Sequence, residues 1–300
     1  MKFTKMHGAG NDYIYIDARS SEEHRAREED WPQLSRSMSH RHYGVGGDGI
    51  ILLLNSDIAD LKMRMFNADG SEGEMCGNGI RCFTKYAIDR AIVATPQHGL
   101  TVETLAGVRT VVPRYEGDSV TGARVAMGKP GLNPQDLPVS LEPTIGYPEK
   151  GYPKNGYPEG PVLDYPLELG GRNMPLTFVS MGNPHAVTFM EEPVADFPLH
   201  TIGPQVEHHP MFPSRVNFEV VNINSQGRLN ARVWERGSGE TMACGTGACA
   251  IAVAARLLGI ASGSVDITLP GGALSIDWDG QGEVFLEGDA EEVFSGEWSG

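Results

Sequence analysis

Short runs of alternating hydrophobic and polar residues, or of clustered β-branched residues, recur along the chain between glycines and prolines. Runs of this kind are typical of β-strands separated by tight turns. The pattern therefore predicts a strand-rich protein, with strands that include residues 13–17, 50–54, 62–66, 100–104, 110–113, 123–127, 177–180, 186–189, 217–223 and 229–235.

Helices are fewer. One is predicted to begin near Asp30, with Pro32 in its first turn, and to end before Gly44. A second follows Cys76, because hydrophobic residues recur there at helical spacing. Its spaced hydrophobic positions are Ile80, Phe83, Ala87, Ile88, Ala91 and Ile92.

A third predicted helix follows Cys244 and stops near Gly259. It is apolar on nearly every side, so protein should surround it. A sheet curled around the helix would meet that requirement.

The chain repeats itself at a long interval. Met75-Cys76-Gly77-Asn78-Gly79 matches Met242-Ala243-Cys244-Gly245-Thr246-Gly247, and Gly10-Asn11 matches Gly182-Asn183. The offsets are similar, 168 residues for the cysteines and 172 for the Gly-Asn pairs. We therefore expect a duplicated domain, with an N-terminal half at 1–128 plus 289–300 and a C-terminal half at 129–288.

Three Gly-Tyr-Pro pentads fill residues 146–160. Proline at every fifth position forbids a helix, and the spaced glycines disfavour a core strand. This segment is predicted to be a surface insert in the C-terminal half, and a tyrosine-rich recognition surface is the alternative.

Composition and charge exclude several classes of protein. The net charge is −15, whereas nucleic-acid binding depends on clustered Lys and Arg. Neither an apolar signal-peptide core nor a membrane-spanning run of about 18 apolar residues is found. The sequence thus predicts a cytoplasmic protein without nucleic-acid or membrane partners, in which the cysteines stay reduced.

A cysteine directly before a helix has unusual surroundings. Free N–H groups and the helix dipole favour negative charge there, and they can lower a thiol pKa from about 8.5 to roughly 3.5–7.5. The same N–H groups can bind a carboxylate, and glycines let a ligand approach the backbone. We therefore expect lowered thiol pKa values at Cys76 and Cys244.

Two such cysteines suit inversion of an α-carbon. A thiolate could remove the proton from one face while a thiol supplies a proton to the other, without a cofactor. The simpler interpretation of each Cys-Gly is a small buried residue at a turn. Zinc binding is disfavoured, because Cys76/Cys82 and Cys244/Cys249 point about 240° and 140° apart around a helix. Cys82 and Cys249 are predicted to be core residues.

The segment Gly44-Val45-Gly46-Gly47-Asp48-Gly49 matches the G-x-G-x-x-G dinucleotide fingerprint literally. That fingerprint follows a strand and opens a helix. Here the glycines follow a predicted helix and open a predicted strand, so nucleotide binding is not expected.

Six segments together resemble the diaminopimelate epimerase family. They occur in order along nearly the whole chain: HGAGNDY, RHYGVGGDG, FNADGSEGEMCGNGIRC, GNPH, RVNFE and ERGSGETMACGTGAC. The asparagine in Cys-Gly-Asn-Gly separates this pattern from proline-racemase-like relatives, which typically carry histidine there. The resemblance implies an α+β fold of two pseudo-symmetric domains, each a curled, barrel-like sheet around a central helix.

The resemblance also implies roles for individual residues. Cys76 and Cys244 correspond to the catalytic acid/base pair, and His185 and Glu235 are candidates for tuning the thiol pKa values. For each asparagine taken alone, a turn or capping role is the simpler alternative. The residues that match substrate-binding positions are Asn11, Asn67, Gly77, Asn78, Asn183, Asn217, Glu235, Arg236, Gly245 and Thr246.

The sequence departs from the family pattern in two places. Some members carry glutamine where Gly49 stands, and the Gly-Tyr-Pro insert is absent from the pattern. Neither departure touches the cysteines, but the insert leaves the shape of the cleft rim open.

The expected activity is interconversion of LL- and meso-2,6-diaminopimelate, a step towards lysine and peptidoglycan, with no cofactor and no metal and with a homodimer as the usual assembly. The alternatives are a racemase of another amino acid such as histidine, and a thiol redox or metal-binding protein. The sequence does not assign either cysteine to a particular epimer.

Overall fold

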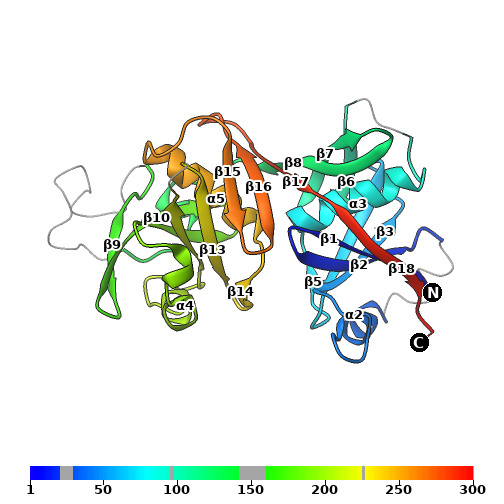
Figure 1. Cartoon of the computed structure of the whole chain (residues 1–300), viewed down its shortest axis with the longest axis horizontal. Helices are drawn as coiled ribbons and strands as arrows, with labels where there is room; N and C mark the ends of the chain where they lie inside the picture. The colour runs from blue at the N-terminus through cyan, green and yellow to red at the C-terminus, as the bar shows by residue number, and fades with distance from the viewer. Residues whose placement is uncertain (21–29, 95–97, 142–159, 225–226, 300) are drawn as a thin grey trace. The chain divides into compact units, whose positions relative to one another are not determined.

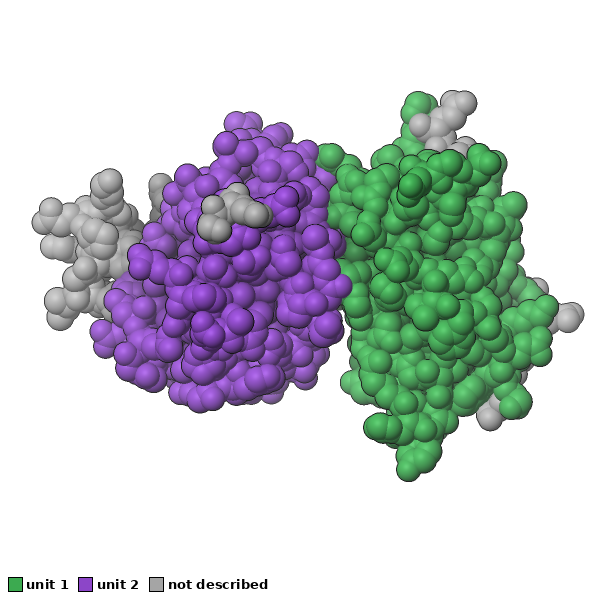
Figure 2. Space-filling model, in the orientation of Figure 1, with its two compact units in different colours: residues 1–126, 287–300 green, residues 127–286 purple. Residues whose placement is uncertain are grey.

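The computed structural model describes residues 1–20, 30–94, 98–141, 160–224 and 227–299. The chain forms two compact units, unit 1 with residues 1–126 and 287–300, and unit 2 with residues 127–286 (Figure 2). The predicted Gly-Tyr-Pro surface insert lies outside the described residues, except for Gly160.

Unit 1 is built from a strongly curved set of strands. β1 pairs with β18 and β2, β2 runs parallel to β3, β3 pairs with β4, and β4 pairs with β5 and runs parallel to β6, which pairs with β7 and so leads to β8. The bounds are β1 (Lys2–Gly8), β2 (Asn11–Asp17), β3 (Gly49–Leu54), β4 (Leu61–Asn67), β5 (Glu72–Gly73), β6 (Leu100–Thr104), β7 (Gly107–Glu116), β8 (Ser119–Gly128) and β18 (Glu291–Glu297).

Two helices pack against this sheet. α3 (Gly77–Asp89) packs against β1, β2, β3 and β7, which wrap around it (Figure 1). α2 (Trp31–Ser39) packs against β3 and β4. Because β3 contacts both helices, its two faces are buried, and this is why its sequence is a continuous hydrophobic run.

Unit 2 repeats the order of unit 1. β10 pairs with β9 and β11, β11 runs parallel to β12, β12 pairs with β13, and β13 pairs with β14 and runs parallel to β15, which pairs with β16. The bounds are β9 (Tyr165–Leu169), β10 (Arg172–Ser180), β11 (Pro184–Met190), β12 (Asn217–Ile223), β13 (Leu229–Glu235), β14 (Gly239–Thr241), β15 (Val265–Leu269), β16 (Gly272–Asp277) and β17 (Val284–Asp289), which leads back into unit 1.

The central helix of unit 2 is α5 (Gly245–Leu257), enclosed by β10, β11, β12, β15 and β16 (Figure 1). All its residues from Gly247 to Ala255 are buried, which explains why it is apolar all round. Each unit thus folds as a curled sheet around one helix, and the predicted fold class is confirmed.

One further helix was not predicted. α4 (Leu199–Glu207) contains Pro204, which argues against a helix when the sequence is read alone. It forms because tertiary contacts bury Leu199, Ile202 and Val206. A Cβ on Gly203 would lie 2.6 Å from the Trp234 ring, so glycine permits the close approach of α4 to β13.

Short 3₁₀-helices, η1 (Pro134–Asp136) and η2 (Val194–Asp196), complete the regular elements of the described residues. None of the helices in this part of the chain is long and apolar enough to cross a membrane.

Candidate active site

Cys76 and Cys244 each occupy the N-cap position of a central helix. Both have extended backbone angles, φ −128° and ψ 120° at Cys76 before α3, and φ −111° and ψ 115° at Cys244 before α5. The second glycine of each Cys-Gly-x-Gly segment, Gly79 or Gly247, donates its N–H to the cysteine Sγ at 3.3 Å. The predicted helix starts are confirmed, and both thiols are free.

The same glycines let each helix start pack closely on the strand beneath it. A Cβ on Gly79 would lie 2.7 Å from Ile51 Cδ1 of β3, and a Cβ on Gly247 would lie 3.0 Å from Glu219 Oε1 of β12. The first contact is apolar and the second is a carboxyl oxygen. The two cysteines therefore share a backbone geometry but differ in what lies below them.

Burial opposes the effect of the helix terminus at both cysteines. Burial raises the pKa of the partly exposed Cys76 thiol, although the N–H groups of the first turn of α3 lower it. Burial also raises the pKa of the Cys244 thiol well above its usual value, and the Glu235 and Glu219 carboxyls add to the rise. The expected lowering of both thiol pKa values was wrong, because withdrawing a thiolate from water outweighs the N–H donors.

In unit 1, Asn11 is the centre of the contacts around Cys76. The Cys76 Sγ donates to Asn11 Oδ1 at 3.2 Å, and Asn78 Nδ2 donates to the same oxygen at 3.3 Å. Asn11 Nδ2 donates to Asp48 Oδ2 at 2.6 Å. Since a carboxylate only accepts hydrogen bonds, Asp48 fixes the orientation of the Asn11 amide and points its oxygen at the thiol.

Asp48 belongs to a small charged network that sequence reasoning missed. Arg41 Nη2 lies 2.8 Å from both Asp48 Oδ1 and Asp12 Oδ1, and Lys5 Nζ lies 2.6 Å from Asp12 Oδ2. Asp48 lies in the glycine-rich segment that resembles a dinucleotide fingerprint. That segment leads into strand β3, not into a helix, as expected from the sequence.

In unit 2, a chain of polar contacts leads away from Cys244. Its Sγ lies 3.4 Å from Thr246 Oγ1, to which Asn183 Nδ2 donates at 3.3 Å. Asn183 Oδ1 lies 3.0 Å from His185 Nε2, and His185 Nδ1 lies 2.7 Å from Glu219 Oε1. Both ring nitrogens of the buried His185 therefore face side-chain oxygens.

Glu235 is the second carboxyl beside Cys244, and it ends β13. Thr241 Oγ1 donates to Glu235 Oε1 at 2.5 Å, and the carboxyl also hydrogen-bonds with the thiol of Cys244. Burial raises the pKa of Glu235, and the nearby Glu219 raises it further. Two carboxyl groups near Cys244, those of Glu235 and Glu219, thus disfavour a further negative charge there.

Two of the predicted substrate-binding residues, Asn67 and Asn217, hydrogen-bond within their own units and not with the cysteines. Asn67 Nδ2 donates to Ser71 Oγ within its own turn, at 3.0 Å. Asn217 donates from Nδ2 to the Pro184 carbonyl at 3.0 Å and accepts the Arg236 N–H at 2.8 Å. Both ends of the Asn217 amide are thereby used within unit 2.

The Arg236 side chain is exposed, and its Nη1 donates to the Ser214 carbonyl at 3.1 Å. Gly49 has no room for a side chain, since a Cβ there would lie 2.1 Å from the Phe66 carbonyl oxygen.

Arg81 and Glu219 are the buried charged residues near the cysteines that the sequence analysis did not single out. Each lies inside a quoted motif, Arg81 in Cys-Gly-Asn-Gly-Ile-Arg and Glu219 in Arg-Val-Asn-Phe-Glu. Both residues could have been found from the sequence, because each is a charged residue at a position of a predicted helix or strand that would otherwise be buried.

Cys82 and Cys249 are buried in α3 and α5, as predicted for core residues. Burial raises the pKa of Cys82 to about 11. Among the described residues, no group of three or more His, Cys, Asp or Glu side chains is placed to hold a metal ion.

Solved structures with the same fold include several epimerases and racemases. A probable proline racemase from Agrobacterium radiobacter K84 superposes with a TM-score of 0.67 at 14% identity, covering 99% of this chain and 92% of that one. A hydroxyproline epimerase from Agrobacterium vitis gives a TM-score of 0.67 at 13% identity, covering 99% and 91% of the two chains. These similarities establish the fold.

Sequence comparisons are more specific. The family model of diaminopimelate epimerase matches residues 3–132 and 177–293, and the unmatched interval includes the Gly-Tyr-Pro segment. Diaminopimelate epimerases of Desulfovibrio desulfuricans and Desulfitobacterium hafniense are each 46% identical to this chain, over 99% of it and over 98% and 97% of their own lengths. That of Methanococcus maripaludis (strain C6) is 44% identical over 99% of both chains. The chain therefore belongs to the diaminopimelate epimerase family.

Proposed function

We propose that the protein interconverts LL- and meso-2,6-diaminopimelate, with Cys76 and Cys244 as the two groups that exchange protons with the α-carbon. The observation that carries this proposal is the pair of free cysteines, each the N-cap of a buried central helix, in a chain that matches the family over its length. In the forward direction one thiolate removes the α-proton and the other thiol donates its proton to the opposite face, which inverts the centre.

The helix starts supply donors for the charge that develops during proton removal. Loss of the α-proton moves negative charge into the substrate carboxylate, and preorganised N–H groups stabilise it there. Gly79 and Gly247 already donate to Sγ atoms. The N–H groups of the two preceding residues in each helix are proposed to bind the substrate carboxylate, since the first N–H groups of a helix lack intrahelical partners. These residues are Gly77 and Asn78 on α3, and Gly245 and Thr246 on α5.

The remaining predicted residues suit a substrate with a second amino-acid head. Asn11 contacts Cys76, whereas the residues proposed to recognise the distal head are Asn67, Asn183, Asn217 and Arg236. Glu235 is proposed to bind a substrate ammonium and, with His185, to set the ionisation of Cys244. We also propose that the reaction requires no cofactor and takes place in the cytoplasm, in a homodimer.

The test is turnover of purified, reduced protein in deuterium oxide with LL-diaminopimelate, beside a panel of L-amino acids that includes histidine. We expect the LL form to approach equilibrium with the meso form, with one deuterium entering the inverted α-carbon. Inversion of another amino acid but not of diaminopimelate would overturn the substrate assignment. Activity that disappears on dialysis against a chelator and returns with metal would overturn the cofactor-free mechanism.

Arg236→Lys is expected to lower kcat/KM for diaminopimelate by roughly ten- to a hundredfold. An ammonium cannot reproduce the two-pronged contact of a guanidinium with a carboxylate, and a charge-assisted contact contributes about 1.5–3 kcal/mol. The loss should appear mainly in KM. Arg228→Lys, at an exposed arginine with no proposed role, is the matched control. An unchanged KM together with a lower melting temperature would show that Arg236 only braces its turn against Ser214.

The raised thiol pKa values predict an alkaline pH dependence. The base must be a thiolate, so activity is lost as pH falls below the pKa of that thiol. Because burial raises the pKa of both Cys76 and Cys244, kcat/KM should still rise between pH 7 and pH 9, by up to about tenfold per pH unit. A profile that is already flat below pH 7 would contradict this expectation.

A further inference from the structure

The two cysteines have equivalent backbone positions but opposite electrostatic surroundings. Five residues after the N-cap cysteine, α3 carries Arg81 and α5 carries Cys249. Both side chains are buried, at 0% exposure each. The same place in the two helices is therefore filled by a cation in unit 1 and by an uncharged thiol in unit 2.

The strand pairings identify two further pairs of equivalent positions at which the two units carry different residues. Ile51 of β3 and Glu219 of β12 occupy the same place under the second glycine of each motif. Asn67 pairs with Gly49 across β3 and β4, and Glu235 ends β13 at the corresponding place beside β12. Two neutral residues of unit 1 thus correspond to two carboxyl groups of unit 2.

Arg81 is an unusual occupant of its position. Its Nη1 donates to the Gly77 carbonyl at 3.0 Å, its Nε donates to the Asp289 carbonyl at 3.3 Å, and its buried Nη2 has no hydrogen-bond partner within the described residues. A cation close to a helix N-terminus opposes the helix dipole, and the first turn of α3 contains no acidic residue. A buried cation placed in this way requires an anion nearby to offset its desolvation.

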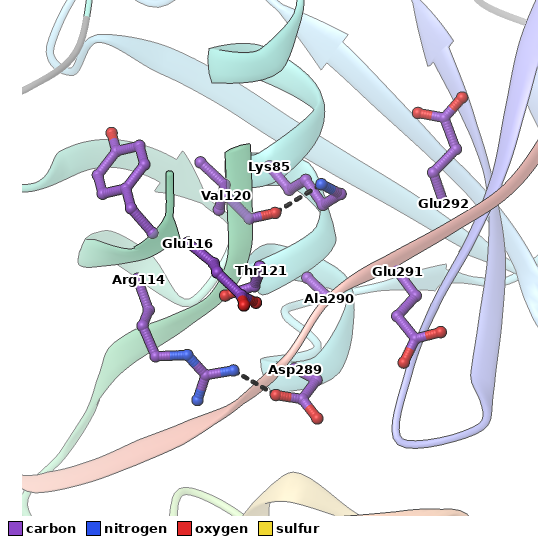
Figure 3. Close-up of a pocket in the computed structure, with 10 residues that line it drawn as sticks. Lys85, Arg114, Glu116, Val120, Thr121, Asp289, Ala290, Glu291 and Glu292 are labelled. Atoms are coloured by element: carbon purple, nitrogen blue, oxygen red, sulfur yellow. Dashed lines mark hydrogen bonds and ion pairs between the residues drawn. The ribbon is translucent and has the colours of Figure 1, made fainter. Parts of the chain in front are cut away.

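The carboxylate of Asp289 favours the Arg81 cation through its charge, but its hydrogen bond is with another residue. It accepts from Arg114 Nη2 at the rim of an open pocket of about 690 Å³ in unit 1, where Lys85 donates to the Val120 carbonyl (Figure 3). Arg81 contacts only the main-chain oxygen of Asp289. The group of α3 that can become an anion in the first turn is the Cys76 thiol.

We propose that Arg81 is a positioning residue that makes Cys76 the first of the two cysteines to ionise, while Glu219 and Glu235 keep Cys244 protonated. As the pH rises, the substrate-free protein then gains its thiolate base at Cys76 while Cys244 keeps its proton and remains the acid. The electrostatic effects act in the direction that this order requires. Arg81 favours the Cys76 thiolate, and both carboxyls disfavour the Cys244 thiolate. The meaning of this order for catalysis rests on the proposed function, but the order itself does not.

Other titratable groups face Cys76 from neighbouring elements. Tyr13 of β2 hydrogen-bonds with the thiol and favours its ionisation, whereas Cys82 of α3 is a buried, un-ionised neighbour. Burial raises the pKa values of Tyr13 and Tyr15 well above their usual range, so both stay neutral during the titration. Asp48 accepts a hydrogen bond from the Asn11 amide, whose oxygen accepts from the Cys76 thiol.

The test is alkylation of the substrate-free protein by iodoacetamide across a range of pH, with mass spectrometry of the peptides that contain Cys76 and Cys244. The midpoint of each rate profile is compared, since Cys76 is partly exposed and Cys244 is buried and absolute rates would reflect access as well. In the wild-type protein we expect the midpoint of Cys76 to lie below that of Cys244. A Cys244 midpoint at or below that of Cys76 would overturn the proposal without any variant.

Arg81→Gln removes the charge and keeps hydrogen-bond donors. We expect the Cys76 midpoint to rise by at least about one pH unit, which slows its alkylation about tenfold at a fixed pH below the midpoint, while the Cys244 profile stays unchanged. Arg81→Lys keeps the charge and should restore most of the difference, whereas a purely structural role would leave both variants alike. An unmoved Cys76 midpoint in Arg81→Gln would refute the role of Arg81.

If Arg81→Gln does not fold, Arg81→Met is measured in its place, because it fills a similar volume without a charge. The alkylation requires no turnover. A protein that is alkylated in the expected order but does not invert diaminopimelate would overturn the proposed function and leave this inference intact. A protein that inverts diaminopimelate but is not alkylated in that order would overturn this inference and leave the proposed function intact.

Discussion

Cys76→Ala and Cys244→Ala are each expected to abolish inversion of diaminopimelate while leaving a folded protein. A positioned acid or base typically contributes about a hundred- to ten-thousandfold to rate, and inversion needs one such group on each face of the α-carbon. Loss of a helix N-cap costs only about 0.5–2 kcal/mol, so the fold should survive. Substrate NMR in deuterium oxide provides the measurement.

The variants should also differ in an informative way. A protein with one remaining cysteine can remove the α-proton and return deuterium to the same face, so each variant should exchange one epimer without inverting it. The two variants should exchange opposite epimers, which would assign each cysteine to its substrate face. Cys82→Ala and Cys249→Ala are the matched controls, since both are buried thiols in the same helices and should affect stability alone. Near-normal inversion in either catalytic variant would exclude the two-cysteine mechanism.

Glu219→Leu is expected to lower the free energy of unfolding by about 3–5 kcal/mol. Glu219 and His185 are both fully buried, with Oε1 and Nδ1 2.7 Å apart. Glu219→Leu leaves the buried His185 ring without this partner, and removing one member of such a buried pair is strongly destabilising. Urea denaturation followed by fluorescence provides the free energy.

Replacing both members, His185→Leu with Glu219→Leu, should recover much of that loss, because an apolar pair of similar volume needs no charge compensation. Asp89→Asn serves as the comparison, since the partly exposed Lys85–Asp89 pair lies one helical turn apart and should contribute no more than about 0.5 kcal/mol. A loss below about 1 kcal/mol for Glu219→Leu would contradict a stabilising role for this buried pair.

The local pattern was enough to locate the main elements. The strands predicted at 50–54, 217–223 and 229–235 occur within β3, β12 and β13, and α3 and α5 begin directly after the two cysteines. These features depend on hydrophobic periodicity and on residues next to one another in sequence, so a single sequence contains the necessary information. The fully apolar segment after Cys244 also required an enclosing sheet, which unit 2 provides.

Elements that depend on distant partners could not be found in this way. α4 contains Pro204 and forms because Gly203 packs closely against Trp234, a contact between residues far apart in the chain. β18 is almost entirely exposed, so it lacks the alternation that marks a half-buried strand, and it is defined by its pairing with β1.

The features of the candidate active site likewise separate into those set by neighbouring residues in the sequence and those set by the tertiary structure. The sequence by itself determined that two Cys-Gly-x-Gly segments open helices and that their N–H groups face the thiols, because capping is a local property of the backbone. Only the tertiary structure decided the charge around each thiol. It brought the charge of Arg81 near Cys76 and placed Glu219 and Glu235 near Cys244. It also buried Cys244 and withdrew much of Cys76 from water, which reversed the expected direction of their pKa values. Desolvation and long-range charge depend on what the folded chain brings together, and they outweigh the local effect of a helix terminus.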